Sequence, residues 1–367
     1  MYLSNNREGR PSRALYQFKR ADLDGRRQIA EREHNSSLVI WQLHECASSA
    51  PLDPFSTLSF SELAIELAAE FDDPDLLSWA HSELGNIHRL LADYDSAKHH
   101  LERGISLAVS PYQQADANRQ RGVLPLTMQY DSAAAFRYLD RAFQISSKAS
   151  PRIYTDRGHP IVLQSKALAH YYHALLHEET HVEQAILLLE AVLNTACRRH
   201  ARRSRRAALN NLVTIPLIFD RPVDPCLIDR LICTYNSLRE KSSLLGARIR
   251  WALIRVEIRE EGYTEARRRR LLTVRSHIAK KGAFRVAGLL TLDIAAHDIT
   301  VGRPRRVRLF LEASRPLLEQ GGLEKVSCAL LSGIITEEEV LGARREALLR
   351  SVLGRVAARA RVKRPPG

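Results

Sequence analysis

The chain has 367 residues, of which 45% are hydrophobic and 26% are charged, as is usual for a soluble folded protein. Its first residues lack the apolar segment of a secretory signal, and no apolar run is long enough to cross a bilayer. The five cysteines form no C-x-x-C pair, which argues against a disulfide framework or a zinc knuckle. We therefore expect a cytoplasmic protein without membrane contact.

The net charge of +13 is unevenly spread along the chain. Residues 1–190 hold 19 Lys and Arg against 25 Asp and Glu, a net charge of −6. Residues 191–367 hold 36 against 17, a net charge of +19. This asymmetry predicts that the two halves attract one another or attract different partners.

The N-terminal part of the chain is predicted to be helical after a short disordered start. Residues 1–12 are expected to be disordered, and residues 13–76 to form helices that pack on the segment that follows. The run Ser59-Phe60-Ser61-Glu62 resembles a capping box, which would open a helix over residues 63–71.

A helical hairpin is indicated next, by the spacing of three residues. The small Gly85 allows one helix to approach another, and the small Ala97, twelve residues later, does the same from the second helix. Leu101 follows one turn later on the same face. Residues 89–94 between them form the predicted tight turn.

The pattern recurs along the chain, which predicts one array of six imperfect repeats over residues 77–320. The later copies are marked by Gly122 with Ala133, Ala174 with Ala185, residues 209–213 with Pro225, Ile254 with Ala266, and Ala295 with Val307. Residues 321–361 are predicted to form capping helices, including one over residues 337–361, and residues 362–367 a mobile basic tail.

This arrangement resembles the tetratricopeptide repeat, which has small residues at its eighth and twentieth positions and a large apolar residue at its twenty-fourth. The resemblance implies an all-α fold, a right-handed α-solenoid of antiparallel helical hairpins. It also implies a non-enzymatic scaffold or a signal-sensing adaptor, as in bacterial proteins of this type, which binds a protein or peptide in a concave groove. Because each hairpin packs only on its neighbours, a bulky residue at Ala97 or Ala266 should destabilise the array.

The resemblance also predicts which side chains line the groove, since fixed positions of each first helix do so in the family. Asn side chains there would bond a peptide backbone, and Arg side chains would bind carboxylates or phosphates. One set, at 248, 251, 255 and 259, lies along one helical face irrespective of the resemblance. The predicted groove residues are Trp79, Ser82, Asn86, Arg89, Arg119, Asn210, Asn211, Arg248, Trp251, Arg255 and Arg259.

Runs of arginine suggest an alternative function, the binding of nucleic acid or another polyanion through the basic C-terminal half. Residues 197–206 read CRRHARRSRR, and residues 267–270 are four consecutive arginines. No helix-turn-helix, zinc-finger or stacking-aromatic pattern accompanies them. The competing explanation for these runs is a generally Arg-rich composition of the chain. The candidate residues are Arg198, Arg199, Arg202, Arg203, Arg205, Arg206, Arg267 and Arg268.

The string His177-Glu178-Glu179-Thr180-His181 has the H-E-x-x-H form of zinc hydrolases, a second alternative. In those enzymes the string lies within a helix, so that both imidazoles share one face. Here it falls in a predicted turn without an evident third ligand, so surface histidines are the preferred interpretation. The sequence has no P-loop, dinucleotide glycine motif or G-x-S-x-G. We expect no catalytic residues, no metal ligands and no cofactor, and the oligomeric state stays open.

Overall fold

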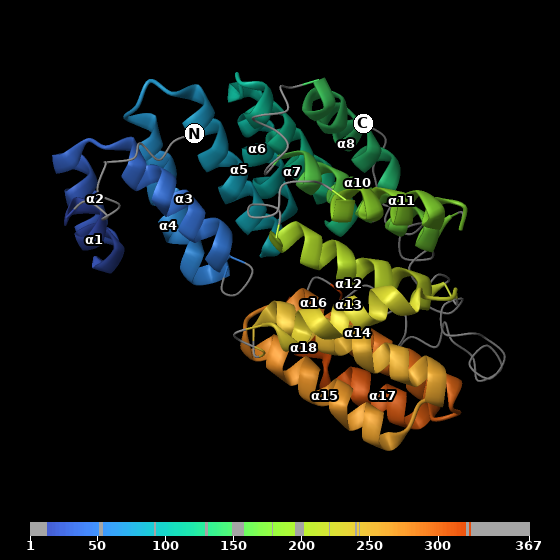
Figure 1. Ribbon diagram of the computed structural model, residues 1–367. Helices are drawn as coiled ribbons and strands as arrows, with labels where there is room; N and C mark the ends of the chain where they lie inside the picture. Colours follow the sequence, from blue (N-terminus) through green and yellow to red (C-terminus); the bar gives the residue numbers. More distant parts are fainter. Residues whose placement is uncertain are drawn as a thin grey trace, which may run out of the picture. The chain divides into compact units, whose positions relative to one another are not determined.

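The computed structural model describes residues 13–50, 54–91, 93–128, 131–148, 158–177, 179–194, 202–219, 221–238, 241, 243–320 and 323. Over these residues the regular structure is entirely α-helical, as predicted (Figure 1). None of the described helices combines the length and apolarity that a membrane-spanning segment needs. The chain divides into two compact units, Met1–Arg121 and Gly122–Gly367. The division falls inside the stretch that the repeat pattern treats as one array.

Capping side chains and prolines set where the helices of the first unit begin. Asp22, Asn35, Asp73 and Asp93 each accept a hydrogen bond from a backbone N–H of the following first turn. Pro74 occupies the start of its helix, where a missing N–H costs no bond. The helices are α1 (Arg13–Arg20), α2 (Leu23–Glu33), α3 (Ser36–Ser49), α4 (Pro54–Ala69), α5 (Pro74–Leu90), α6 (Tyr94–Leu107) and residues 111–121 of α7 (Pro111–Met128).

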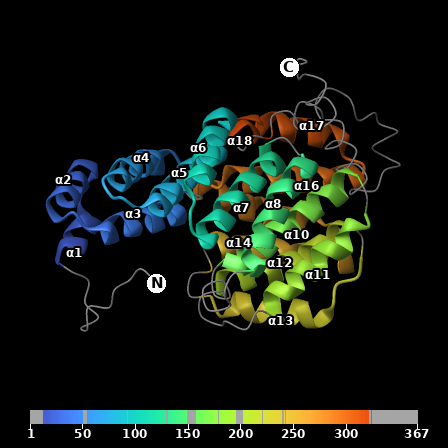
Figure 2. The same cartoon turned by 90° about the horizontal axis from the view of Figure 1, so that it is seen from above.

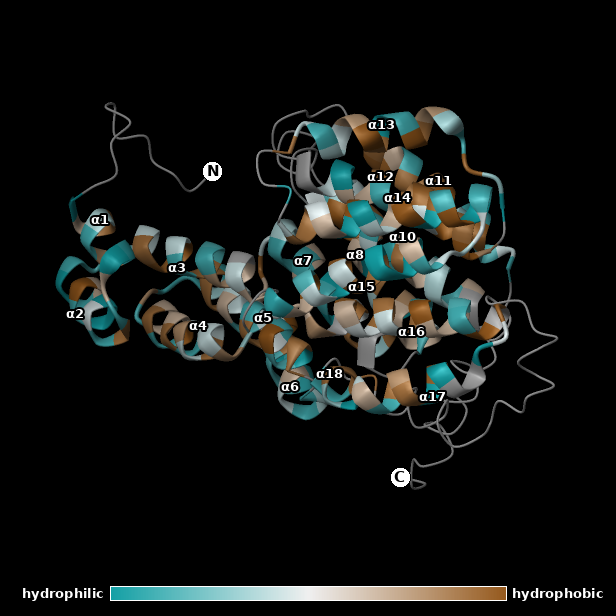
Figure 3. Ribbon diagram, turned by 90° about the horizontal axis from the view of Figure 1, so that it is seen from below, coloured by the Kyte–Doolittle hydropathy of each residue, from teal (hydrophilic) through white to brown (hydrophobic). Residues whose placement is uncertain are grey.

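Consecutive helices of the first unit pack against one another, α1 on α2, α3 on α4, α4 on α5 and α5 on α6 (Figure 2). The apolar sides of α1 to α5 form one core, in which Phe18, Leu43 and Leu67 are almost fully buried. Each such side chain contributes about 1.5–3 kcal/mol to folding. Apolar and polar segments alternate along these helices in Figure 3, as an amphipathic sequence requires.

The second unit repeats this organisation, with α8 packed on α10, α10 on α11, α11 on α12, α14 on α15 and α15 on α16. Asp224, Ser243 and Thr264 cap three of its helices. The helices are the rest of α7, α8 (Ser132–Lys148), α10 (Gly158–Leu176), α11 (His181–Asn194), α12 (Arg202–Ile218), α13 (Pro225–Asn236), α14 (Leu244–Glu261), α15 (Glu265–Lys280), α16 (Phe284–Thr300), α17 (Pro304–Ala313) and α18 (Arg315–Gln320).

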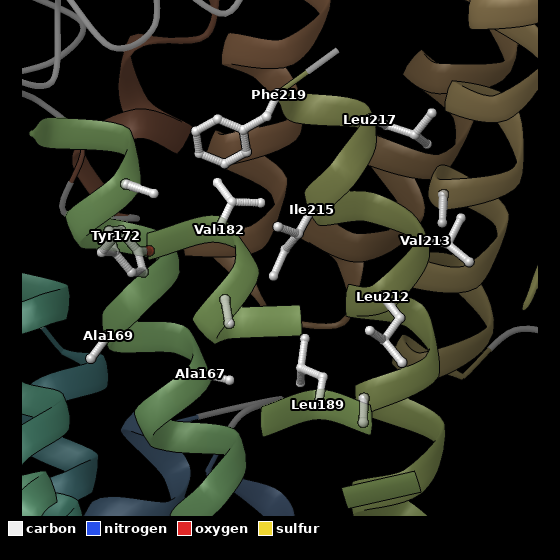
Figure 4. Packing of buried hydrophobic residues seen from close by; sticks show 14 of the residues in the cluster. Ala167, Ala169, Tyr172, Val182, Leu189, Leu212, Val213, Ile215, Leu217 and Phe219 are labelled. Atoms are coloured by element: carbon white, nitrogen blue, oxygen red, sulfur yellow. The ribbon is translucent and has the colours of Figure 1, made fainter. Parts of the chain in front are cut away.

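The largest core of the second unit is built from side chains of α10, α11 and α12 together with neighbouring helices. Figure 4 shows Val182 and Leu189 of α11 directed at the side chains of α12, among them Leu212 and Ile215. These residues are at most 4% exposed. Small residues of α10 such as Ala167 allow the close approach of the helices, and the Leu and Val side chains fill the space between them.

Two hairpins of the chain share the same closest contact between their helices. A Cβ atom at Gly85 would lie 2.7 Å from the Leu101 Cγ atom and 3.1 Å from the Ala97 carbonyl oxygen. At Gly122 the corresponding distances are 2.7 Å to the Leu139 Cγ atom and 3.2 Å to the carbonyl oxygen of residue 135. The predicted glycine contacts are thus present in the first two repeats, although the small partner in the second is not the expected one.

Charged pairs hold three helices of the second unit together within its interior. Asp293 and Asp298 of α16 are 3% and 0% exposed. The Arg255 guanidinium of α14 donates to Asp293 at 3.1 Å, and the Arg268 guanidinium of α15 donates to Asp298 at 2.8 Å. Tyr263 adds a hydrogen bond from its hydroxyl to Asp298 at 3.1 Å. Each buried carboxylate therefore has both a cation and a neutral donor, the latter being Trp251 at Asp293, and this offsets the cost of desolvation.

Three local predictions are wrong. The capping box at 59–62 lies inside α4, because the helix already begins at Pro54. Ala133 is exposed, and Ala135, four residues after the capping Asp131, is the buried small residue of the second repeat. Ala266, the predicted small packing residue of its repeat, is exposed as well.

The error at Ala266 arises because the buried position of these helices lies four residues after the capping residue. Ala97 stands four residues after Asp93, and Arg268 stands four residues after the cap Thr264. Arg268 is buried, because its charge is met by Asp298. The capping helices predicted over residues 321–361 lie outside the described residues except at residue 323, as do the segments 1–12 and 362–367.

Candidate functional site

A polar face in the first unit is built from side chains of α5 and α7. The Trp79 indole N–H donates to a Glu83 carboxylate oxygen at 3.2 Å, one turn further along α5. On α7 the Arg119 guanidinium contacts the Asp116 carboxylate at 2.7 Å, and the Gln120 amide donates to that carboxylate at 3.3 Å. A side-chain hydrogen bond from Gln120 to Glu83 connects the two helices.

Glu83 is the most perturbed acid of this face. The residue is 6% exposed, and burial together with the nearby Asp116 carboxylate raises its pKa to about 7. The hydrogen bonds from Trp79 and Gln120 and the charge of Arg119 act in the opposite direction. A carboxyl group that changes charge near neutral pH, inside a polar face, is a feature typical of functional sites.

The face continues onto α3 and along α5. The His44 ring of α3 meets the Trp79 ring edge-on, with ring centroids 4.9 Å apart. On α5 the Arg89 guanidinium donates to the Asn86 amide oxygen at 2.6 Å. Trp79, Asn86, Arg89 and Arg119 are each partly exposed. We call this set of His44, Trp79, Glu83, Asn86, Arg89, Asp116, Arg119 and Gln120 the polar face.

The polar face holds four of the predicted groove residues, and a fifth residue, Ser82, is placed elsewhere. Ser82 is fully buried, and its hydroxyl oxygen lies where a side chain at Gly104 of α6 would be. It therefore packs α5 on α6 and is not accessible to a ligand. Glu83, Asp116 and Gln120 were not predicted, and the only signal for Glu83 was an acid among apolar neighbours on α5.

The groove residues predicted in the second unit do not form one open face. Arg248 and Arg259 are exposed on α14, whereas Trp251 and Arg255 donate to the buried Asp293. Trp251 and Arg255 therefore connect α14 to α16, and the side chain of Arg255 is only 5% exposed. On α12, Asn210 and Asn211 are half-buried, and the Asn210 side-chain oxygen finds no donor within the described residues.

Much of the basic charge on α15 and α17 is paired within the molecule. Arg267 forms ion pairs with Glu257 and Glu261, and Arg270 also pairs with Glu257. Arg306 binds Glu265 through two hydrogen bonds of 2.8 and 2.9 Å. The predicted polyanion residue Arg268 is buried against Asp298, so it is not available to a polyanion.

The other polyanion candidates belong to the segment that leads into α12. Arg198 and Arg199 lie outside the described residues, and the side chains of Arg202 and Arg203 are likewise not described. Arg205 and Arg206 line a surface hollow of about 360 Å³ between α11, α12 and α13. Its other lining residues are Leu193, Leu209, Asp229, Arg230, Cys233 and Thr234.

The H-E-x-x-H string lies in the turn between α10 and α11, as predicted. His177 follows the end of α10 and is exposed, His181 begins α11, and Glu178 lies outside the described residues. His181 turns toward α10, where its Nδ1 atom is 2.9 Å from the Nδ1 atom of His170. Within the described part of the chain, no three His, Cys, Asp or Glu side chains are arranged to hold a metal ion. The zinc-hydrolase alternative stays a prediction, which the described residues do not test.

Comparison with known proteins does not identify a family. No protein-family model matches the sequence, and no curated protein matches it significantly.

Proposed function

We propose that this chain is a tetratricopeptide-like, right-handed helical repeat adaptor that binds a protein or peptide segment on the polar face of its first unit. The repeated Gly–Leu contacts of the hairpins at Gly85 and Gly122 support the repeat assignment. The polar face carries side chains from α3, α5 and α7, the first helices of successive hairpins. These are the helices whose outward positions line the groove in the resembling family.

The observation that carries the proposal is Trp79, a half-buried indole surrounded by polar groups that already have fixed partners. Trp79 is held by Glu83 and His44, so little rotational freedom is lost when a partner covers it. Aromatic and Arg side chains with such surroundings are the usual anchors of protein interfaces. Arg119 and Asn86 beside it provide donors for carboxylates and for peptide carbonyl groups.

Site-specific photocrosslinking tests the proposal on the full-length protein. A photoreactive amino acid at position 86 or 119 should capture one discrete protein from a lysate of the source organism, at high salt and after nuclease treatment. The same group at Lys98, an exposed residue of α6 outside the polar face, is the matched control. The variant Trp79→Ala should abolish the capture. Equal capture from all three positions would show that the polar face is not the binding surface.

A further inference from the structure

The hollow between α11, α12 and α13 combines an apolar floor with a positively charged rim. Leu193 and Leu209 are 7% and 4% exposed and form its floor. Of the described residues, Arg205, Arg206 and Arg230 lie around it, and Asp229 adds a carboxylate. The volume of about 360 Å³ is at the small end of the range for ligand sites. It is large enough for a small organic molecule.

Among the described residues, two of the three guanidinium groups have no partner. The Arg205 and Arg230 side chains form no ion pair and no hydrogen bond with the residues that the structure describes, although Asp229 is next to Arg230 in the chain. This contrasts with α15, where neighbouring carboxylates bind Arg267, Arg268 and Arg270. Available guanidiniums around an apolar floor favour an anionic ligand with an organic part.

The net charge of the rim favours a phosphate monoester over a carboxylate ligand. The described lining residues carry three guanidiniums and one carboxylate, a formal net charge of about +2, which matches a phosphate monoester of about −1.5 to −2 near neutral pH. A carboxylate ligand would neutralise only half of it. The planar guanidinium group also binds phosphate through two parallel hydrogen bonds, which adds geometric selectivity.

We infer that the hollow lined by Leu193, Arg205, Leu209 and Arg230 is a binding site for a small phosphate monoester. The phosphate contacts the arginines of α12 and α13, and the organic group lies on the two leucines. This site is in the second unit and is independent of the proposed partner surface in the first. It also gives a specific ligand chemistry to Arg205, one of the predicted polyanion residues, in place of a general attraction to polyanions.

The hollow contains its own reporter, the exposed Cys233 thiol, and the same helix carries a matched control. Cys226 is also exposed on α13, but it does not line the hollow. A bound ligand should protect Cys233 from the neutral reagent iodoacetamide and leave Cys226 unaffected. Peptide mass spectrometry of the intact chain after timed alkylation measures the two rates separately from those of the other cysteines.

Phenyl phosphate is the probe, and it should slow alkylation of Cys233 about tenfold at roughly ten times its dissociation constant, because only the ligand-free fraction reacts. Inorganic phosphate should protect at higher concentration only, since it lacks the group that covers the leucines. Benzoate should protect much less. Protection of both thiols, protection of neither, equal protection by benzoate, or protection by duplex DNA alone would each overturn the inference.

Substitutions in the rim give a second test. Arg205→Gln and Arg230→Gln should each raise the phenyl phosphate concentration needed for protection by at least about tenfold, since one charged hydrogen bond is lost. Arg137→Gln, which changes an exposed arginine of α8 far along the chain from the hollow, should leave it unchanged. Circular dichroism of each variant checks that it is folded. Unaltered protection in both rim variants would contradict a role for these guanidiniums.

Discussion

Leu101 on α6 occupies the space that a side chain at position 85 on α5 would need, since a Cβ atom there would lie 2.7 Å from the Leu101 Cγ atom. Leu101 is fully buried, so it has little room to move aside. The two residues therefore fix how closely α5 and α6 approach, and Gly122 with Leu139 does the same in the second unit.

Gly85→Ala is expected to destabilise the protein by about 1–3 kcal/mol through overpacking against Leu101. At a helix position with free space around it, the same change would stabilise the protein by up to about 1 kcal/mol. The sign of the change in the free energy of unfolding therefore distinguishes a crowded position from an open one. Denaturant unfolding followed by circular dichroism measures it. The double variant Gly85→Ala, Leu101→Ala should show a favourable coupling between the two sites. A stabilised Gly85→Ala protein would contradict the close contact.

Asp298→Ala is expected to cost about 3–5 kcal/mol, because it leaves the buried guanidinium of Arg268 without its counterion. Replacing both partners with apolar residues, Asp298→Leu and Arg268→Met, should cost less than either single change. The exposed pair of Arg308 and Glu312 is the control, and Glu312→Ala should change the free energy of unfolding by less than about 1 kcal/mol. Equal effects at both sites would contradict a buried ion pair.

Acid is expected to destabilise the α5–α6 hairpin through its histidines. The Nδ1 atoms of His81 and His100 lie 3.0 Å apart, and burial together with neighbouring imidazoles lowers the pKa of His100 to about 4. The unfolded chain, with a pKa near 6.5, binds the proton first, so stability present above pH 6.5 is lost as the pH falls toward 4. The stability lost is smaller than about 1.4 kcal/mol per unit of pKa difference, because solvent screens the half-exposed ring.

His100→Gln should therefore lose less stability than the unaltered protein between about pH 7 and about pH 5. Denaturant unfolding at the two pH values measures the difference. His177→Gln, at an exposed position after α10, is the control and should keep the original pH dependence. A pH dependence that is the same in all three proteins would rule out the histidine pair as its source.

The hairpins could be predicted from sequence because their signals are local. Gly85, Ala97 and Leu101 are spaced by the helical period, and the caps Asp73 and Asp93 precede the helices that they begin. The register of the later repeats was harder to predict, because the position that Ala97 occupies in the first repeat is occupied by Arg268 in a later one. A buried arginine there depends on Asp298, thirty residues later, and no local pattern indicates that partner.

The candidate site was predicted only in part, for the same reason. Trp79 and Arg119 follow from their positions on first helices, but Glu83 is defined by Asp116 and Gln120, which α7 brings to it. Sequence alone also could not show that the Arg255 guanidinium is bound to the Asp293 carboxylate. Side chains whose role depends on contacts between helices become recognisable only once the helices are packed.

Glu83→Gln is expected to stabilise the protein at alkaline pH. Because the folded-state pKa of Glu83 is raised from 4.5 to about 7, the stability that is present below pH 4.5 is lost as the pH rises through 7. Glutamine keeps an oxygen that accepts from Trp79 but carries no charge to bury. The variant should therefore be more stable than the unaltered protein by roughly 2–3 kcal/mol above about pH 8, and about equally stable near pH 4.5.

The same variant separates stability from function. If the polar face binds a partner through the Glu83 carboxylate, Glu83→Gln should weaken photocrosslinking from position 119 while it stabilises the fold, as happens when a site retains a buried charge at the expense of stability. Denaturant unfolding followed by Trp fluorescence measures the first effect, and crosslinking yield the second. A variant that is destabilised at alkaline pH would show that the carboxylate is a structural element of the α5–α7 contact, held in its charged form by Arg119 and Trp79.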